Sequence, residues 1–432
     1  MCREKRITMG QKELSRWHVL EMAEAGKITL KEAAVSMGVS YRQAKRIRRA
    51  VRLSGVKGLI HGNASRAPAN RISDSVRERV LELSQQLYAG FNDTHFTEKL
   101  LSREGIDLSR ETVRSLRRQA GIAPKRKRRA PKHRKRRVRM AQEGLMVLWD
   151  GSVHHWFGPG QPPCCLISAL DDATGKVLCA RFFPFEGTFG YLWSLRKILD
   201  DYGIPMAIYQ DRHGSLHRND NHWSMEEQLA GRQLPTQVGV ALEALSIRPI
   251  FALSPQAKGR IERLFQTLQD RLVAELALAQ INSPEPANDF LQQTFIEAFN
   301  QKFPISPQQS QRAWRNVPKP LDLNRIISFH YSSTVANDNT VRLAGITIDI
   351  PPGPHRRSYA KAKVEVRQLL DGSWRIYHND QLIAEHPPTN INEPIRALPR
   401  RTVRLNHALP NSLIYMASAP HCVDLPLSTG VP

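Results

Sequence analysis

The stretch LMVLWDGSVHHWF, residues 145–157, opens the part of the chain in which apolar runs have the length and composition of β-strands. Two further runs follow, CCLISAL at 164–170 and VLCARFFPF at 177–185, and the turn-forming segments GPGQPP and DDATGK separate the three. Runs this close, joined by Gly- and Pro-containing turns, favour antiparallel neighbours. The sequence therefore predicts a three-stranded meander.

The pattern changes from strand to helix after the meander. Residues 188–203 carry apolar side chains at helical spacing, and IPMAIYQD at 204–211 is a short buried strand that ends at Asp211. A short helix at 238–245, the strand IRPIFAL and a long amphipathic helix from about 256 complete the series. The order β-β-β-α-β-α-β-α predicts an α/β core with a mixed five-stranded sheet.

The positive charge of the chain is concentrated in its first third. The net charge is +23, and residues 1–139 alone hold 35 basic and 13 acidic residues, whereas residues 140–432 hold 28 and 27. Such asymmetry indicates that the first third docks a polyanion, most simply DNA. The near-neutral remainder must have another task.

Residues 12–52 predict three short helices in the form of a helix-turn-helix. TLKE at 29–32 and SYRQ at 40–43 are capping sequences, and SMGVS between them contains the glycine of a turn. The second capped helix would face DNA with Arg42, Lys45, Arg46 and Arg49. A generic three-helix bundle with a solvated basic face is the alternative.

A second helix-turn-helix-like unit is predicted over residues 73–122, and a basic linker follows it. The last helix of this unit begins at Ser109 and would expose Arg110, Arg114 and Arg117. Residues 124–139 hold eleven basic residues and no acid, so this run is expected to stay extended and neutralise phosphates. Its predicted DNA contacts are Lys125, Arg126, Lys127, Arg128 and Arg129.

Beyond the core, the chain alternates short strands with Gly and Asn turns, which predicts a small β-barrel at 325–390. A polar, Pro-containing connector is expected near 282–320, and a Pro-rich tail at 391–432. The predicted multidomain plan is 1–60 helix-turn-helix, 73–122 second DNA-binding unit, 123–140 linker, 141–320 catalytic core, 325–390 barrel and 391–432 tail.

Neither a membrane segment nor a metal-binding cysteine pattern is apparent. No window approaches 18 consecutive apolar residues, and the N-terminal residues lack an apolar signal core. The five cysteines form no C-x-x-C pair, so neither structural zinc nor a disulfide framework is expected. We expect a cytoplasmic protein, associated with the nucleoid of a bacterium.

Three carboxylates occupy informative positions in the predicted core. Asp150 lies in the first strand, Asp211 at the end of the fourth, and Glu262 on the long last helix. Phosphodiester chemistry by two divalent cations needs carboxylates that hold the metals and leave positions open for water and phosphate. Either aspartate alone is more often a turn residue, so the argument depends on all three positions together.

The motifs LWDGS, YQDRHG and SPQAKGRIERLFQTLQDRL resemble the three blocks of the DDE transposase and retroviral-integrase superfamily, most closely bacterial insertion-sequence transposases. The third block is the most specific, with Ser254, Pro255, Lys258, Gly259, Glu262 and Arg263. The resemblance, over residues 12 to about 320, implies an RNase H-like core and a two-Mg²⁺ site on Asp150, Asp211 and Glu262, with Mn²⁺ as a substitute. It also implies DNA cleavage and strand transfer at transposon ends.

The sequence departs from the commoner family pattern in the interval between Asp211 and Glu262, which is longer than in many members, and in the Arg-His-Gly that follows Asp211. On spacing alone, Glu226, Glu227 and Glu243 are rival third ligands. Lys258 and Arg260 are expected to meet DNA phosphate near a helix N-terminus. His213 has no firm role.

Asp171 is a further candidate. If the first hairpin turns near residue 160, Asp171 lies opposite Asp150 on one face of the sheet. Because the sequence DDATG is typical of a turn, turn chemistry is the favoured role of Asp171.

These observations favour a transposase that binds double-stranded transposon ends and target DNA and works as a homo-oligomer, since two ends are joined together. Two alternatives are a catalytically silent DNA-binding regulator derived from a transposase and an RNase H-like nuclease.

Overall fold

The computed structural model describes residues 9–60, 71–126, 130, 137–218, 220–252, 258–319, 321–343, 345–353 and 357–389. The chain divides into two compact units, Met1–Ala130 and Pro131–Pro432, and each is described by itself. Several predictions fall outside the described residues: those for Lys127, Arg128, Arg129, Ser254, Pro255 and the tail at 391–432.

The first unit begins with the predicted helix-turn-helix. Its helices are α1 (Gln11–Glu24), α2 (Leu30–Ser36) and α3 (Tyr41–Ser54), and the 3₁₀ segment η1 (Gly55–Leu59) follows. Both predicted caps are present, because Thr29 and Glu32 form a reciprocal capping box and the Ser40 hydroxyl accepts a hydrogen bond from the Gln43 amide. The three-helix prediction is confirmed.

Helix α3 exposes its basic side chains as predicted. Among the described residues, Arg42, Arg46 and Arg49 are exposed and pair with no carboxylate. Lys45 is also exposed and lies over the ring of Tyr41, 4.5 Å from its centroid.

The second group of helices consists of α4 (Asp74–Gln85), α5 (Asp93–Glu104) and α6 (Arg110–Gln119). Arg110 and Arg114 are exposed, but the prediction that Arg117 is exposed is wrong. The Arg117 side chain is buried, with Nη1 2.8 Å from an Asp93 carboxylate oxygen and 3.2 Å from the Phe91 carbonyl oxygen. A carboxylate on α5 therefore draws this arginine inward.

The second unit is built on the mixed five-stranded sheet that the sequence predicts. Its strands are β1 (Val147–His154), β2 (Cys164–Asp171), β3 (Val177–Phe183), β4 (Ala207–Gln210) and β5 (Arg248–Phe251). Their spatial order is β3-β2-β1-β4-β5. The first three pair antiparallel, and β1-β4 and β4-β5 pair parallel.

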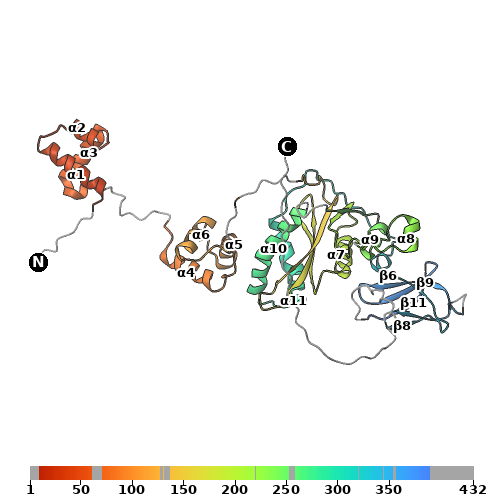
Figure 1. Ribbon diagram of the computed structural model, residues 1–432. Helices are drawn as coiled ribbons and strands as arrows, with labels where there is room; N and C mark the ends of the chain where they lie inside the picture. Colours follow the sequence, from red (N-terminus) through yellow and green to blue (C-terminus); the bar gives the residue numbers. More distant parts are fainter. Residues whose placement is uncertain are drawn as a thin grey trace, which may run out of the picture. The chain divides into compact units, whose positions relative to one another are not determined.

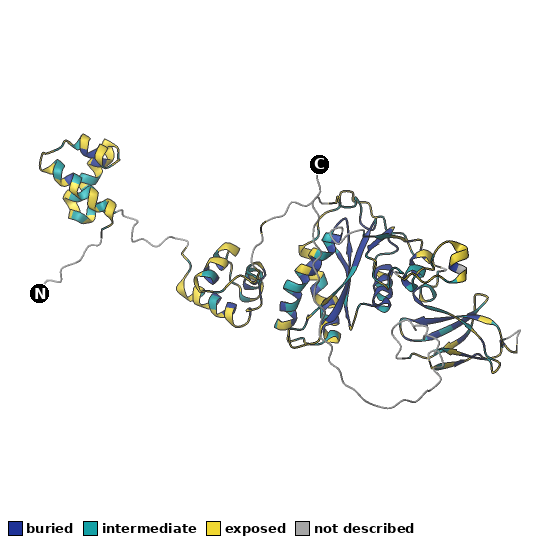
Figure 2. Ribbon diagram, viewed as in Figure 1, coloured by how far each residue is buried: buried dark blue, intermediate teal, exposed yellow. Residues whose placement is uncertain are grey.

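Helices cover both faces of this sheet. One face packs against α7 (Thr188–Asp201) and α9 (Gln237–Ala244), and its core includes Val147 and Trp149. The other face packs against α10 (Gly259–Leu278), and its core includes Leu148 and Tyr209. Figure 1 shows α7 and α10 on opposite sides of the strands, and Figure 2 shows the buried layer between them.

The segment predicted as a connector near 282–320 is helical over residues 284–302, so that prediction is wrong for its first half. Helices α11 (Pro284–Phe290) and α12 (Ile296–Lys302) flank a π-helical segment, Leu291–Phe295. Leu291, Phe295 and Phe299 recur every four residues and join the core on the α10 face. Burial of this apolar stripe stabilises the helices, and Pro284 stands in the first turn of α11, where a proline is tolerated.

Two asparagines of this segment close the outer edge of β3. Asn288 Oδ1 accepts a hydrogen bond from the Phe182 amide at 2.7 Å, and its Nδ2 donates to the Phe182 carbonyl. Asn300 Oδ1 likewise accepts a hydrogen bond from the Val177 amide at 2.9 Å, and its Nδ2 donates to the Val177 carbonyl at 2.8 Å. Side-chain amides thus hydrogen-bond to backbone N–H and C=O groups of β3 that an edge strand would otherwise leave unpaired.

The C-terminal strands form two sheets. A four-stranded antiparallel sheet is formed by β6 (Ser328–Thr334), β9 (Lys363–Leu369), β10 (Trp374–His378) and β11 (Gln381–His386), in the spatial order β11-β10-β9-β6. In the second sheet, β7 (Thr340–Leu343) pairs with β8 (Ile346–Asp349). Val341, Ile348, Val366 and Trp374 share one core. No hydrogen-bonded ladder joins the two sheets within the described ranges, so the predicted closed barrel is not confirmed.

Strand β6 is attached to the core. The Gln237 side chain on α9 accepts a hydrogen bond from the His330 amide at 2.8 Å and donates one to the His330 carbonyl at 2.9 Å. Short helix α13 (Leu323–Ile326) leads into the strand. Within the described ranges, no helix has both the length and the apolar content needed to cross a membrane.

Candidate active site

The sheet places Asp150 and Asp211 side by side. Val147 and Leu148 of β1 lie opposite Ile208 and Tyr209 of β4 in parallel register, and two more residues along each chain lead to the two aspartates. Alternation of side chains along a strand puts both aspartates on the face that α10 covers. The prediction that these two carboxylates are neighbours is met by the geometry, whereas their role stays a prediction.

A cation from α10 lies between the two carboxylates. Lys258, the residue before the first turn of α10, has its ammonium nitrogen 2.8 Å from Asp150 Oδ1 and 3.2 Å from Asp211 Oδ2. Its side chain is 8% exposed. Lys258 is therefore enclosed in the site, and in this arrangement its ammonium group does not face solvent as a DNA-contacting group would.

Backbone amides also bind the two carboxylates. Asp150 Oδ1 also accepts from the Gly151 amide at 3.1 Å, and Asp211 Oδ1 accepts from the His213 amide at 2.9 Å. The Arg-His-Gly sequence that departs from the family pattern thus forms a turn on the Asp211 side chain. This is a structural use for the His213 backbone.

Glu262 lies one turn after Lys258 on α10, and its side chain is half-buried. Among the residues described, no three His, Cys, Asp or Glu side chains converge closely enough to hold a metal ion. The structure therefore brings Asp150 and Asp211 together and leaves Glu262 outside their immediate contacts. The assignment of Glu262 as third ligand stays a prediction.

Glu186 is a fourth carboxylate at this site, and sequence reasoning missed it. Its Oε1 accepts a hydrogen bond from the Tyr191 hydroxyl at 2.5 Å, and His213 Nδ1 lies 3.7 Å from the same atom. A Cβ atom added to Gly151 would lie 2.6 Å from the Glu186 carboxyl carbon, so a glycine there makes room for it. The only sequence signal is a lone glutamate before a predicted helix, which carries no pattern.

The electrostatics of the site follow from burial and crowded negative charge. Burial raises the pKa of Asp150 to about 6, and the charges of Asp211 and Glu186 act in the same direction, whereas Lys258 opposes them. Burial also raises the pKa of Tyr191 well above its ordinary value. Tyr191 is therefore a neutral donor to Glu186, and the site as a whole favours a cation.

Asp171 does not share a face with Asp150. The observed register pairs Asp150 with Ser168 and pairs Asp171 with Val147, so the prediction that Asp171 lies opposite Asp150 is wrong. The hairpin turns one to two residues earlier than assumed. The Asp171 carboxylate accepts from the Gly144 amide and from the amide and hydroxyl of Thr174, which is turn chemistry.

Its neighbour Asp172 joins the basic linker to α10. Arg137 pairs with this fully buried carboxylate, and the Met140 amide donates to it at 2.8 Å. Arg260 places Nη1 2.5 Å from Asp172 Oδ1 and Nη2 2.5 Å from the Arg137 carbonyl. Arg260, predicted to bind DNA, is thus engaged inside the protein, because the buried carboxylate needs cationic partners.

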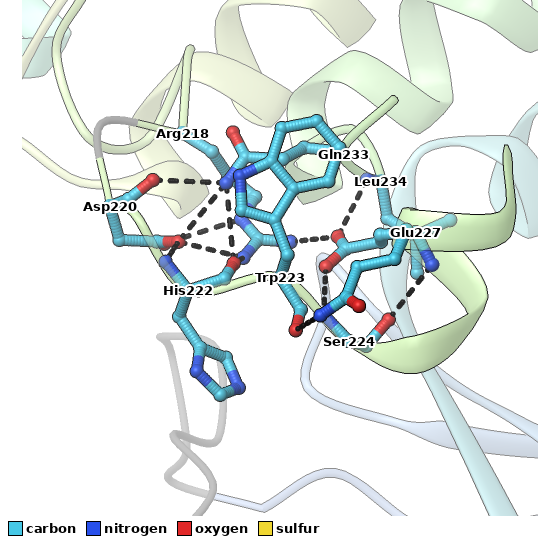
Figure 3. A network of polar contacts seen from close by, with 9 residues as sticks. Arg218, Asp220, His222, Trp223, Ser224, Glu227, Gln233 and Leu234 are labelled. Atoms are coloured by element: carbon cyan, nitrogen blue, oxygen red, sulfur yellow. Dashed lines mark hydrogen bonds and ion pairs between the residues drawn. The ribbon is translucent and has the colours of Figure 1, made fainter. Parts of the chain in front are cut away.

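The long interval between Asp211 and Glu262 contains a small, separately stabilised segment (Figure 3). Glu227, on α8 (Met225–Ala230), is buried and pairs with Arg218. Its carboxylate also accepts from the amides of Ser224 at 2.8 Å and Leu234 at 2.7 Å.

Two of the three rival ligands are accounted for by the structure. The carboxylate of Glu227 is occupied by these folding contacts, and Glu243 is exposed on α9, on the opposite face of the sheet. The side chain of Glu226 lies outside the described residues.

The residues at the site fit a divalent cation. Asp150 and Asp211 offer carboxylate oxygens, the ligand type that Mg²⁺ prefers. The ammonium group of Lys258 occupies the position between them, which shows that this position attracts positive charge. A metal bound there would contact oxygen donors from β1 and from the end of β4.

Two proteins of known description resemble most of the chain. "Putative transposase y4bF" of Sinorhizobium fredii (strain NBRC 101917 / NGR234) is 37% identical over 317 residues, which cover 73% of this chain and 67% of that protein. The transposase for insertion sequence IS1202 of Streptococcus pneumoniae is 31% identical over 414 residues, 86% of each chain.

Family and structural comparisons add less. Residues 16–78 match the winged helix-turn-helix family model. The simian T-cell lymphotropic virus intasome solved with PP2A regulatory subunit B56 gamma matches 72% of this chain and 100% of that chain, at 13% identity and a TM-score of 0.30. The dimeric HTLV-2 integrase catalytic core domain in complex with magnesium matches 35% of this chain and 89% of that chain, at 15% identity and a TM-score of 0.24. TM-scores this low establish no shared fold.

Proposed function

Because this chain belongs to the transposases of insertion sequences, we propose that it cleaves DNA at transposon ends and joins those ends to target DNA. Asp150, Asp211 and Glu262 are proposed as the metal-binding carboxylates. The observation that carries the proposal is the Asp150–Asp211 pair, which the sheet register holds around a cation at the start of α10.

The chain's own residues have distinct tasks in this proposal. In it, Asp150 and Asp211 hold positive charge on the α10 face, and Glu262, in the first turn of α10, is the third ligand. A divalent ion, when bound, would lower the pKa of an attacking water or 3′-hydroxyl and neutralise charge on the scissile phosphate. We propose two Mg²⁺ ions, replaceable by Mn²⁺.

DNA recognition is proposed for the first unit. The exposed side chains Arg42, Lys45, Arg46 and Arg49 lie on α3, the second helix of the helix-turn-helix. Arg110 and Arg114 on α6, with Lys125 and Arg126 after it, would add phosphate contacts. Two transposon ends must be joined in concert, so we propose that a homo-oligomer assembles on DNA.

The test uses duplexes that carry the terminal sequences flanking this chain's gene. Asp150→Asn, Asp211→Asn and Glu262→Gln should each lower Mg²⁺-dependent strand transfer by ~10³-fold or more, since each removes a charge that acts on the transition state. End binding in gel shifts should be unchanged. A Glu243→Gln protein, altered in an exposed carboxylate away from the site, is the matched control.

Product analysis separates the alternatives. Hydrolysis without joining, on every end tested, would identify a nuclease. End binding without any metal-dependent cleavage by the unaltered protein would identify a regulator. Full activity in one of the three variants would remove that residue from the proposed site.

A further inference from the structure

The position of Lys258 has a consequence for metal binding. Its ammonium nitrogen lies within 2.8 and 3.2 Å of the two carboxylate oxygens that are proposed to hold a metal ion. Mg²⁺ in proteins lies about 2.0–2.1 Å from its oxygen ligands. An ammonium group and a divalent cation cannot share this position, because both need the same oxygens and they repel each other.

We propose that Lys258 is a tethered competitor of the divalent cation: its ammonium group must leave the Asp150–Asp211 pair before a metal ion binds between them. The proposal rests on the proposed function, which places the metal at this pair. It assigns Lys258 a second task besides the DNA contact predicted from the sequence.

The surroundings of Lys258 hold its side chain in this position. Lys258 is buried, so the ammonium group has little water to compensate for loss of its carboxylate partners. Two residues later, Arg260 fastens the start of α10 to Asp172 and to the Arg137 carbonyl. The ammonium group thus reaches the site from a backbone that is anchored two residues later in the chain.

Charge favours the exchange once a metal is present. Asp150 and Asp211 carry two negative charges, Glu186 adds a third nearby, and Lys258 supplies one positive charge. A divalent ion neutralises the aspartate pair more completely than an ammonium group does. The flexible four-carbon stem of lysine allows the head group to move away without a change in the helix.

The same stem suits the displaced group to a phosphate. Lysine binds phosphate as a point charge, and a DNA backbone near the first turn of α10 would offer one. DNA and metal would then both favour release of Lys258 from the aspartates. The lysine would therefore lower metal occupancy of the protein without DNA.

The experiment measures Mn²⁺ binding by the full-length, DNA-free protein, with free Mn²⁺ followed by electron paramagnetic resonance. If the competing contact is populated ~90% of the time or more, its removal raises apparent affinity at least ~10-fold. Lys258→Met should therefore bind Mn²⁺ at least ~10-fold more tightly than the unaltered protein. Arg263→Met, which removes one charge from an exposed position in the next turn of the chain after Lys258, should change the affinity by less than about twofold.

Two further measurements guard against a misfolded variant. Lys258→Gln keeps much of the side-chain length without the charge and should give the same tightening. In the unaltered protein, acetylation of the Lys258 amine by acetic anhydride, followed by peptide mass spectrometry, should increase when Mn²⁺ is added. The exposed Lys45 amine serves as the internal reference.

The outcomes distinguish this inference from the proposed function. Equal or weaker Mn²⁺ binding by Lys258→Met and Lys258→Gln, with binding that still depends on Asp150, would overturn the competitor and leave the metal site standing. If the unaltered protein shows no Mn²⁺ binding that is lost in Asp150→Asn and Asp211→Asn, both the competitor and the proposed metal site are overturned.

Discussion

Helices α3 and α6 begin at serine caps and carry several arginines each, but the arginines have different partners. On α3, Arg42, Arg46 and Arg49 are exposed. On α6, Arg117 and Arg118 both pair with Asp93, and Arg117 is buried. Periodicity fixes which side of a helix a charge lies on, but a carboxylate on another helix decides whether that charge is available to a partner.

The largest expected effect is on the stability of the α4–α6 group. Arg117→Ala leaves the Phe91 carbonyl without its donor and Asp93 with only Arg118, so we expect a loss of about 3 kcal/mol, the low end for a broken buried pair. Hydrogen exchange of α6 peptides in the full-length protein measures it. Protection equal to that of the unaltered protein would mean that the Arg117–Asp93 pair contributes no more to stability than an exposed arginine of α3 does.

The next effect is on DNA affinity. Arg46→Ala/Arg49→Ala should weaken binding of any duplex by ~10-fold or more and reduce the slope of log affinity against log salt by about two, one for each lost phosphate contact. Fluorescence anisotropy over a salt series measures both. Hydrogen exchange of α3 should stay as it is, and an unchanged salt slope would contradict a phosphate-facing α3.

A smaller effect on stability and on DNA affinity is expected at Arg114, which is exposed on α6 as the arginines Arg42, Arg46 and Arg49 are on α3. Arg114 is exposed and pairs with Glu111 one turn earlier, at 3.1 Å. Arg114→Ala should lower the free energy of unfolding by less than about 0.5 kcal/mol and the salt slope by about one. If Arg114→Ala lowered the protection of α6 as much as Arg117→Ala does, burial of the arginine would not be what determines its contribution to stability.

The smallest effect concerns Glu24, a carboxylate with which α3 does pair. Arg52 and Arg48 hydrogen-bond to the exposed Glu24 and lower its pKa to about 2. A lowered pKa means that the stability this pair contributes is complete above about pH 4.5 and is lost as the pH falls through about 2. Carbon NMR of the Glu24 carboxyl should titrate near pH 2, and a midpoint near 4.5 would show that the pair does not form.

The sheet was largely predictable because its strands have strong local signals. Runs such as CCLISAL lie between turns, and the helix at 188–203 has a regular apolar stripe. The helices at 284–302 were not predicted, since Pro284, Pro286 and several polar residues mask their apolar spacing. The C-terminal sheets show the limit of strand counting, because closure depends on pairings that composition does not specify.

The candidate site, like the fold, was predictable in part. Asp150 and Asp211 could be placed because Asp150 lies within a recognisable strand and Asp211 directly follows another, and the sheet order then makes them neighbours. Glu186 approaches the site only through folding, by way of Tyr191 and the missing side chain of Gly151. The register error for Asp171 arose because an error of one to two residues in the turn changes the face on which a side chain lies.

The asparagines that cap β3 set a limit on how copies of this chain associate. At the other edge of the sheet, β5 contains Pro249, which has no amide hydrogen to offer an added strand. With Asn288 and Asn300 on one border and a proline on the other, the sheet is poorly suited to growth by strand addition. Assemblies on DNA would then be held by side-chain surfaces, and a continuous intermolecular sheet would signal misassembly.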